Sequence, residues 1–507
     1  MDLPSSQAPR NLAKRGNTLQ LEAGTPVTAV FPESKRQSTS RLDPKANVVW
    51  YLWRKIDRSV RKIDEFSRSP FSHMRSVLKP ANELGPVPGI VKSLKTIFLS
   101  SWLNLLLPCM GACWILHWTE PDQDAAIFAT GFLAIIPLAK LLAFATDELS
   151  LRVGQSLAGL INATLGNVVE LIVAIIALTQ CDLELVQSSL IGSVLSNLLL
   201  VLGMCFFVGG VKFSEQGFAI GAAQLNSSLL ILSAIAVVLP AAYHQVIPKA
   251  SGLEFTAAAD ITQAQILKFS RGIALLMLFS YICFLIFQLG SHTEMYMDDS
   301  NDIVKSTAYK RKTPIESDKT QLQNMNVGSS EGTVEEDDTE HPQLNGWVCV
   351  GLLIVVGVFV AVTAEFFVDS INGLTASGPI SKEFVGIILL PIAGNAAEHV
   401  SAVSVARKDK LTLSIGVAVG SAIQIALFVI PFIVTVAWMM GKPMTLLFDP
   451  FEAICLLLAV MTVNYVVQDG KSNWLEGMIL MCLYGVLAIV FFFYPGMSPV
   501  DHFADCT

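Results

Sequence analysis

Two glutamates stand alone in long apolar stretches of the sequence. Glu170 is the only charged residue in 153–181, and Glu398 is the only charged residue in 384–406. A charge at the centre of a membrane-spanning helix costs about 2.5–3.5 kcal/mol on insertion scales, so such a residue normally faces a partner or a cavity. Two isolated carboxylates therefore indicate a shared polar site rather than two unrelated core acids.

Both glutamates end the same short motif. Residues 166–170 read Gly-Asn-Val-Val-Glu, and residues 394–398, which lie 228 positions further on, read Gly-Asn-Ala-Ala-Glu. A second pair of motifs, Gly-Ser at 192–193 and at 420–421, is again 228 residues apart. Two polar motifs that keep one register indicate an internal repeat.

The side chains in these motifs are hard oxygen donors. Two carboxylates match a divalent cation, and Ca²⁺ accepts 6–8 oxygen ligands at about 2.3–2.6 Å. We expect the metal ligands to be Glu170, Glu398, Asn167, Asn395, Ser196 and Gln424. No Cys or group of His accompanies the two glutamates, which argues against a zinc or copper site.

Glycine and proline in the same spans would shape the site. Small residues let helices approach closely, so we expect helix packing at Gly166, Gly394, Gly192 and Gly420. Pro391 removes a helix hydrogen bond and would leave the Ile387 carbonyl free as a further oxygen ligand.

The same two carboxylates could couple cation binding to protons. Without a cation, two facing carboxylates in a low-dielectric site repel each other and take up protons instead. A site that holds either a cation or protons is suited to antiport. His399 follows Glu398 directly and points about 100° around the helix from it, so we expect His399 to handle protons rather than to bind the metal.

The elements that carry these residues must be membrane helices. Of the 507 residues, 52% are hydrophobic and only 15% charged, with a mean hydropathy of +0.55. Apolar runs of this length span bilayers as helices, which excludes a soluble enzyme and a secreted disulfide scaffold. The sequence predicts an all-α polytopic membrane protein with about eleven spans, at roughly 97–118, 125–146, 155–179, 186–210, 217–241, 270–290, 346–370, 380–406, 411–440, 451–468 and 474–494.

The distribution of basic residues predicts the orientation. Residues 1–95 hold 17 of the 34 Lys and Arg but only 8 of the 42 acids. Because Lys and Arg favour the cytosolic side, we expect a cytosolic N-terminus and, after an odd number of spans, a lumenal C-terminus. Five spans per half would make the two repeats inverted, the architecture of many secondary transporters with a midplane site.

This organisation divides the chain into six parts. They are a basic, largely disordered tail (1–95), a first membrane helix (96–123), a first repeat of five helices (124–290), an acidic cytosolic linker (291–345), a second five-helix repeat (346–496) and a lumenal tail (497–507).

The paired Gly-Asn-x-x-Glu motifs resemble those of the cation/Ca²⁺ exchanger superfamily. The Glu398-His399 pair and the stretch 469–477, which precedes Phe-Phe-Phe-Tyr-Pro at 491–495, resemble the Ca²⁺/H⁺ exchanger (CAX) family of fungal and plant vacuoles. The resemblance covers about residues 95–495. It implies one Ca²⁺ bound between Glu170 and Glu398 as the transported substrate, exchanged for H⁺ from an acidic lumen, with no cofactor.

The resemblance also implies an acidic segment between the two halves. Its acidic run could concentrate Ca²⁺ at the cytosolic mouth as a funnel formed by Glu335, Glu336, Asp337 and Asp338. A solvated linker explains the same residues equally well, and the N-terminal tail matches no family pattern.

Other functions stay open at this level. A Na⁺-coupled Ca²⁺ exchanger of the same fold and a Mn²⁺/H⁺ antiporter are the alternatives, although Ile425, which stands opposite Asn197 in the repeat, weakens the Na⁺ reading. An intramembrane hydrolase lacks the His-Glu-x-x-His face, and a channel would not need titratable ligands on both halves. We expect lipid and the two ions as partners, no nucleic acid, and leave the oligomeric state open.

Overall fold

The computed structural model describes residues 84–250, 255–296, 303, 305–309, 342–377 and 380–496. All of them belong to one compact unit, Phe71–Thr507, and the other unit, Met1–Pro70, lies outside the described residues. The predictions for most of the N-terminal tail, for the acidic residues 335–338 and for the tail 497–507 fall outside the described part of the chain as well.

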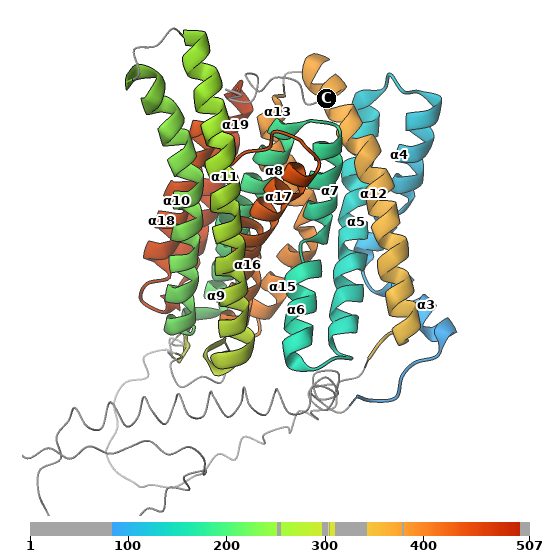
Figure 1. The fold of residues 1–507 in the computed structure, drawn as a ribbon. Helices are drawn as coiled ribbons and strands as arrows, with labels where there is room; N and C mark the ends of the chain where they lie inside the picture. The colour runs from blue at the N-terminus through green and yellow to red at the C-terminus, as the bar shows by residue number, and fades with distance from the viewer. Residues whose placement is uncertain are drawn as a thin grey trace, which may run out of the picture. The chain divides into compact units, whose positions relative to one another are not determined.

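The first half of the chain is a series of apolar helices (Figure 1). They are α3 (Ile90–Leu99), η1 (Trp102–Leu106), α4 (Pro108–Thr119), α5 (Asp124–Ser150), α6 (Gln155–Leu165), α7 (Val168–Thr179), α8 (Leu183–Leu195), η2 (Ser196–Val201), α9 (Leu202–Lys212), α10 (Ile220–Ala250), α11 (Phe255–Ile286), η3 (Phe287–Ser291) and η4 (Thr293–Tyr296).

The second half is helical as well. Its helices are α12 (Gly346–Ser377), α13 (Lys382–Phe384), η5 (Val385–Leu389), α14 (Leu390–Gly394), α15 (Ala396–Ala406), α16 (Leu411–Gln424), η6 (Ile425–Val429), α17 (Ile430–Met439), α18 (Pro450–Val466) and α19 (Trp474–Phe493). Capping residues define where α18 and α19 begin. The Asp449 side chain accepts hydrogen bonds from backbone N–H groups in the first turn of α18, and Asn473 forms a capping box with Glu476 at the start of α19.

The length and composition of the helices suit a bilayer. Seven helices in the described residues are long and apolar enough to cross a membrane, and up to nine spans result if each of two sharply bent helix pairs counts as one. The protein is therefore a mostly helical, multi-span membrane protein.

Besides the helices, the described residues contain a small antiparallel sheet that joins loops at one end of the helices. Its strands are β1 (Phe213–Gly217), β2 (Thr307–Ala308) and β3 (Lys471–Ser472), in the order β2-β1-β3. Strands this short carry no hydrophobic periodicity, so they could not be predicted from the residue pattern.

Several predicted spans are irregular rather than continuous helices. The predicted span 155–179 breaks between α6 and α7, and 380–406 bends by 57° between α14 and α15. Single π-helical turns interrupt the long helices at η2 and at η6. π-turns of this kind occur often at functional sites, and here they follow the Gly-Ser motif in both halves.

The two interrupted helices form the centre of the core. In the apolar window of α8–α9, 72% of the residues are buried, and in that of α16–α17 78% are buried, against 22% for α11 and α19. Figure 1 shows α7 and α8 in the middle of the bundle, with α10 and α11 on one side and α4 and α12 on the other. The central helices are thus held by protein on most sides.

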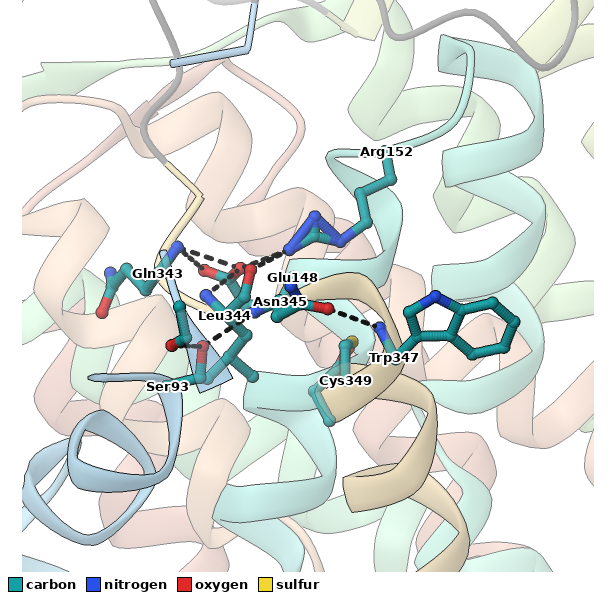
Figure 2. Close-up of polar contacts among 10 residues, drawn as sticks. Ser93, Glu148, Arg152, Gln343, Leu344, Asn345, Trp347 and Cys349 are labelled. Carbon is teal, nitrogen blue, oxygen red and sulfur yellow. Dashed lines mark hydrogen bonds and ion pairs between the residues drawn. The ribbon is translucent and has the colours of Figure 1, made fainter. Parts of the chain in front are cut away.

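A buried carboxylate joins the start of α12 to the end of α5 (Figure 2). Glu148, which is 4% exposed, accepts hydrogen bonds from the backbone N–H groups of Gln343 and Leu344 at 3.1 Å and lies 3.7 Å from the Arg152 guanidinium. Arg152 also donates to the Leu344 carbonyl. Because these donors satisfy the charge, Glu148 fixes where the second half begins.

The packing of the central helices predicts that alanine substitutions at Gly192 and Gly420, which are equivalent in the two motifs, change the stability of the fold by different amounts. A Cβ at position 192 would lie 2.5 Å from the Ile387 backbone, whereas one at Gly420 would meet nothing within 4 Å. We expect Gly192→Ala to cost about 1–3 kcal/mol through overpacking. Gly420→Ala, the matched control, should be neutral or stabilising because alanine favours helix.

Thermal unfolding of the purified protein, followed by size-exclusion chromatography, measures this difference. Equal melting temperatures for the two variants would contradict the close contact at Gly192.

Candidate cation-binding site

Helix breaks place both motif glutamates at the start of a half-helix. α6 ends before Gly166, Asn167 is the N-cap of α7, and Glu170 lies in the first turn of α7. In the second half, Asn395 separates α14 from α15, and Glu398 lies in the first turn of α15. The Gly-Asn pair thus ends one helix and begins another in each half.

The helix ends at these breaks shape the electrostatics of the site. A helix N-terminus carries a partial positive charge, which favours a carboxylate in its first turn by about 0.3–1 kcal/mol. The C-terminal ends of α6 and α14 direct carbonyl groups, and a partial negative charge, toward the same breaks. Each break therefore stabilises its glutamate as an anion and adds negative potential for a cation.

The two halves meet at these breaks. The Glu170 carboxyl lies against Gly394, where a Cβ would be 2.9 Å from Oε1, and the Gln424 amide oxygen lies near Gly166. The carboxyl groups of Glu170 and Glu398 are close enough for their charges to interact. Gly166 and Gly394 thus face site side chains, and both predicted glutamates come together.

A hydrogen-bonded chain of neutral side chains crosses between the halves beside the glutamates. Asn197 Nδ2 donates to Ser421 Oγ at 2.9 Å, and Ser421 Oγ donates to Asn167 Oδ1 at 2.9 Å. All three residues are at most 6% exposed. Asn197 and Ser421 also interact with the Glu398 carboxyl, so they belong to the site although they were not among the expected ligands.

A small cavity adjoins Glu170. It measures about 20 Å³ and is lined by Ser189 and Ser193 of α8, Gly394, and apolar residues of α5, α7 and α14. That volume holds about one water molecule beside Glu170.

The side chains around the breaks are unusually short of hydrogen-bond partners. In the described residues, twelve buried side-chain N or O atoms lack a partner, and six of them lie at this site. Three of the six are acceptor oxygens: Asn197 Oδ1, Asn395 Oδ1 and Glu398 Oε2. Buried acceptors without donors are costly unless a ligand satisfies them, and these oxygens suit a Ca²⁺ ion as substrate.

The donors that the helix breaks bring together are two carboxylates and the amide oxygens of Asn197 and Asn395. Such a donor set suits a hard cation that is bound and released.

Ser196 and the Ile387 carbonyl, both expected to be oxygen ligands, have other neighbours in the structure. Ser196 Oγ lies 3.5 Å from His399 Nε2, so these two side chains face each other across the halves. The Ile387 carbonyl, expected to be free, lies against Gly192 instead of the site. Pro391 is the second residue of α14, which follows the π-turn η5.

The described residues form a bundle of membrane-spanning helices with two glutamates and several buried acceptor oxygens at two helix breaks. A family model described as sodium/calcium exchanger protein matches residues 124–290 and 348–493. The chain belongs to this family, whose members named below are transporters and not enzymes.

Individual relatives are similar over most of the chain. A vacuolar calcium ion transporter of Cryptococcus neoformans var. grubii is 45% identical, covering 83% of this chain and 78% of its own. A Ca²⁺/H⁺ antiporter of Synechocystis is 39% identical, over 75% of this chain and 94% of its own. The solved structure of the Ca²⁺/H⁺ antiporter protein YfkE is 30% identical, covers 79% of this chain and all of that chain, and has a TM-score of 0.57.

The chain of hydrogen bonds through Ser421 predicts a specific loss of affinity. Ser421→Ala removes the contact that holds Asn197 and Asn167 in place, so we expect the KM for Ca²⁺ to rise about 5–10-fold, the cost of one buried hydrogen bond. Ser414→Ala is the matched control, because Ser414 is a buried serine of α16 that donates to the Ala402 carbonyl. Initial rates of ⁴⁵Ca²⁺ uptake against Ca²⁺ concentration measure both, and an unchanged KM in Ser421→Ala would contradict this role.

Proposed function

We propose that this protein is a secondary active antiporter that moves cytosolic Ca²⁺ into an acidic organelle in exchange for lumenal H⁺. The carrying observation is the pair Glu170 and Glu398, brought together by equivalent helix breaks and surrounded by acceptor oxygens without donors. Relatives named vacuolar calcium ion transporter and Ca²⁺/H⁺ antiporter support the choice of ions and of the vacuolar membrane.

The proposed architecture has eleven spans. The long helices and bent pairs account for nine spans. Two shorter apolar helices would add the other two: α7, which continues from α6, and α18, which has 17 residues. One N-terminal helix would then precede two inverted five-helix repeats, 124–290 and 346–496, joined by the cytosolic linker 291–345. Breaks and π-turns at equivalent positions of both halves support this arrangement.

The proposed orientation places the N-terminus in the cytosol and the C-terminus in the lumen. Basic residues support it, since the loops on the proposed cytosolic side carry Arg152, Lys212, Lys471 and the cluster 407–410.

Competition for the same carboxylates would couple the two ions. Ca²⁺ between Glu170 and Glu398 neutralises both charges, and protons neutralise them once Ca²⁺ leaves. The protein therefore changes between its cytosol-facing and lumen-facing conformations with either Ca²⁺ or protons bound at the site. The site ligands in this proposal are Glu170, Glu398, Asn167, Asn395 and Gln424. Ser196 and His399 form a proton-handling pair beside them.

The proton gradient supplies the driving force. Each pH unit contributes about 1.36 kcal/mol per proton, so two or three protons support steep Ca²⁺ accumulation. A sodium-coupled exchanger is the second candidate, which the family description favours. The buried apolar side chain of Ile425, opposite Asn197, opposes it, since Na⁺ would need additional oxygen ligands.

The choice between these couplings can be measured directly. Proteoliposomes with an acidic interior, in sodium-free buffer, should take up ⁴⁵Ca²⁺, and a protonophore should collapse that uptake because the proton gradient is its only source of energy. Uptake that requires a sodium gradient instead would assign the chain to the sodium-coupled branch.

Neutralising either glutamate should abolish transport. Glu170→Gln and Glu398→Gln keep the shape of the side chain but remove both the charge and the titration, so we expect loss of ⁴⁵Ca²⁺ uptake below about 1% of the wild-type rate. Insertion should be normal by size-exclusion chromatography. Near wild-type uptake in either variant would rule out the two-carboxylate site.

A further inference from the structure

Helix α3 makes a sharp angle with the first spanning segment. It meets the helical stretch Trp102–Thr119 at 79°, and Figure 1 shows it at the end of the bundle where α12 begins and where α5 passes to α6. A helix nearly at right angles to a spanning helix runs along the membrane surface rather than across the bilayer. Its side chains must then suit both lipid and water.

The side chains of α3 are divided in this way. One narrow face is buried against protein, because Ile97 packs into the core and Ser93 Oγ accepts a hydrogen bond from the Asn345 N–H at 2.9 Å. The remaining surface carries exposed apolar residues and then two exposed lysines, namely Ile90, Val91, Leu94 and Phe98, followed around the helix by Lys92 and Lys95. With 3.6 residues per turn, these apolar positions cover about 100° of the circumference. An apolar strip beside a basic one is typical of helices that lie in the bilayer interface.

A pocket opens between the segment that leads into α3 and the start of α12. It measures about 390 Å³, and its walls include the apolar side chains of Val87, Leu149 and Val350 together with Arg152 and Trp347. Trp347 is 87% exposed at the second position of α12, and exposed tryptophans at the ends of spans are typical of the interfacial belt. The pocket therefore lies at the level of the lipid headgroups.

The Arg152 guanidinium in this pocket has donors to spare. One of its terminal nitrogens donates to the Leu344 carbonyl and lies 3.7 Å from the Glu148 carboxylate (Figure 2). Its Nε has no hydrogen-bond partner within the described part of the chain. Because a guanidinium carries five N–H donors, Arg152 can bind a further anion while it keeps both protein contacts.

The start of α12 brings the basic residues to one level of the fold. Ser93 of α3 contacts the backbone of Asn345, and the Arg152 side chain lies 3.6 Å from where a Cβ on Gly346 would be. Residues 84–119 contain two lysines and no acid. The only acid described above in this region, Glu148, is 4% exposed and already accepts from two backbone N–H groups. The water-facing side of this region is therefore positively charged.

An exposed apolar stripe continues from the pocket along α12. It consists of Trp347, Val350, Ile354 and Val358, which are 39–87% exposed. These residues are three or four positions apart, so they share one face of the helix. A free anion gains nothing from such a surface, whereas a phospholipid presents a phosphate and acyl chains together.

We propose that this pocket binds the headgroup of an anionic phospholipid in the proposed cytosolic leaflet, with the acyl chains along the exposed stripe of α12. Arg152, Lys92 and Lys95 attract the headgroup, and each basic residue near an anionic leaflet strengthens binding about fivefold. The lipid contacts α5 and α12 and lies beside α3, so it holds the N-terminal helix to the start of the second half. This site goes beyond the proposed transport reaction and depends on the proposed orientation only for the choice of leaflet.

Quenching of tryptophan fluorescence by brominated lipids measures this binding. The full-length protein is reconstituted in phosphatidylcholine vesicles that contain a small fraction of phosphatidylserine, with brominated acyl chains on one of the two lipids at a time. Bromine quenches only tryptophans close to its chain, so brominated phosphatidylserine should quench more than its fraction in the bilayer predicts. Trp347→Phe keeps an aromatic ring but removes the reporter, and this excess quenching should fall.

The lysines of α3 provide the test of charge. The double variant Lys92→Gln and Lys95→Gln should lower the preference for phosphatidylserine over phosphatidylcholine about 30-fold, at about fivefold for each charge. Both side chains are exposed, so insertion should be normal. The double variant Lys408→Gln and Lys410→Gln is the matched control, because it removes the same charge from exposed residues of the α15–α16 loop on the same side. It should keep the wild-type preference.

Three results would overturn the lipid site. The first is an unchanged preference in the α3 double variant, and the second is an equal loss in both double variants, which would show only general attraction between charges. The third is excess quenching that does not fall in Trp347→Phe. Inorganic phosphate at constant ionic strength should leave the excess unchanged, and displacement by it would assign the pocket to a free anion instead. None of these measurements involves Ca²⁺ transport, so they are independent of the test of antiport.

Discussion

The constraint on which this structure depends is the cost of placing two carboxylates in the middle of an apolar bundle. Each costs several kcal/mol unless a partner, a helix end or a ligand compensates it. The chain compensates Glu170 and Glu398 by ending one helix and starting another just before each of them. The remaining charge is left for the transported ion.

That solution weakens the helices that carry it. Breaks and π-turns leave backbone groups without regular partners, and such backbone is tolerated inside a membrane only where protein buries it. The most buried segments of the fold, α8–α9 and α16–α17, are the ones that contain the π-turns η2 and η6. The outer helices α11 and α19 expose most of their surface.

Sequence patterns could predict candidate residues for the site but not how these residues meet in the fold. The register of 228 residues identified Glu170, Glu398 and their asparagines, because isolated charges in apolar runs are unambiguous. Periodicity could not reveal that Gly166 and Asn167 break the helix, since both residues also occur within helices. Ser421 and Asn197 were missed because their partners are about 224–254 residues away and only the packed halves bring them together.

The two halves share helix breaks and π-turns but differ in some of the side chains at equivalent positions. This difference matters for how one half moves against the other. Asn197 of the first half is tied through Ser421 to Asn167, whereas its counterpart Ile425 is buried and can make no such bond. Ser193, the counterpart of Ser421, faces the cavity beside Glu170 instead. The polar connection between halves therefore reaches Glu398, and the small cavity lies beside Glu170. Rocking of one half against the other must exchange these environments, because a carrier that opened both sides together would leak its gradient.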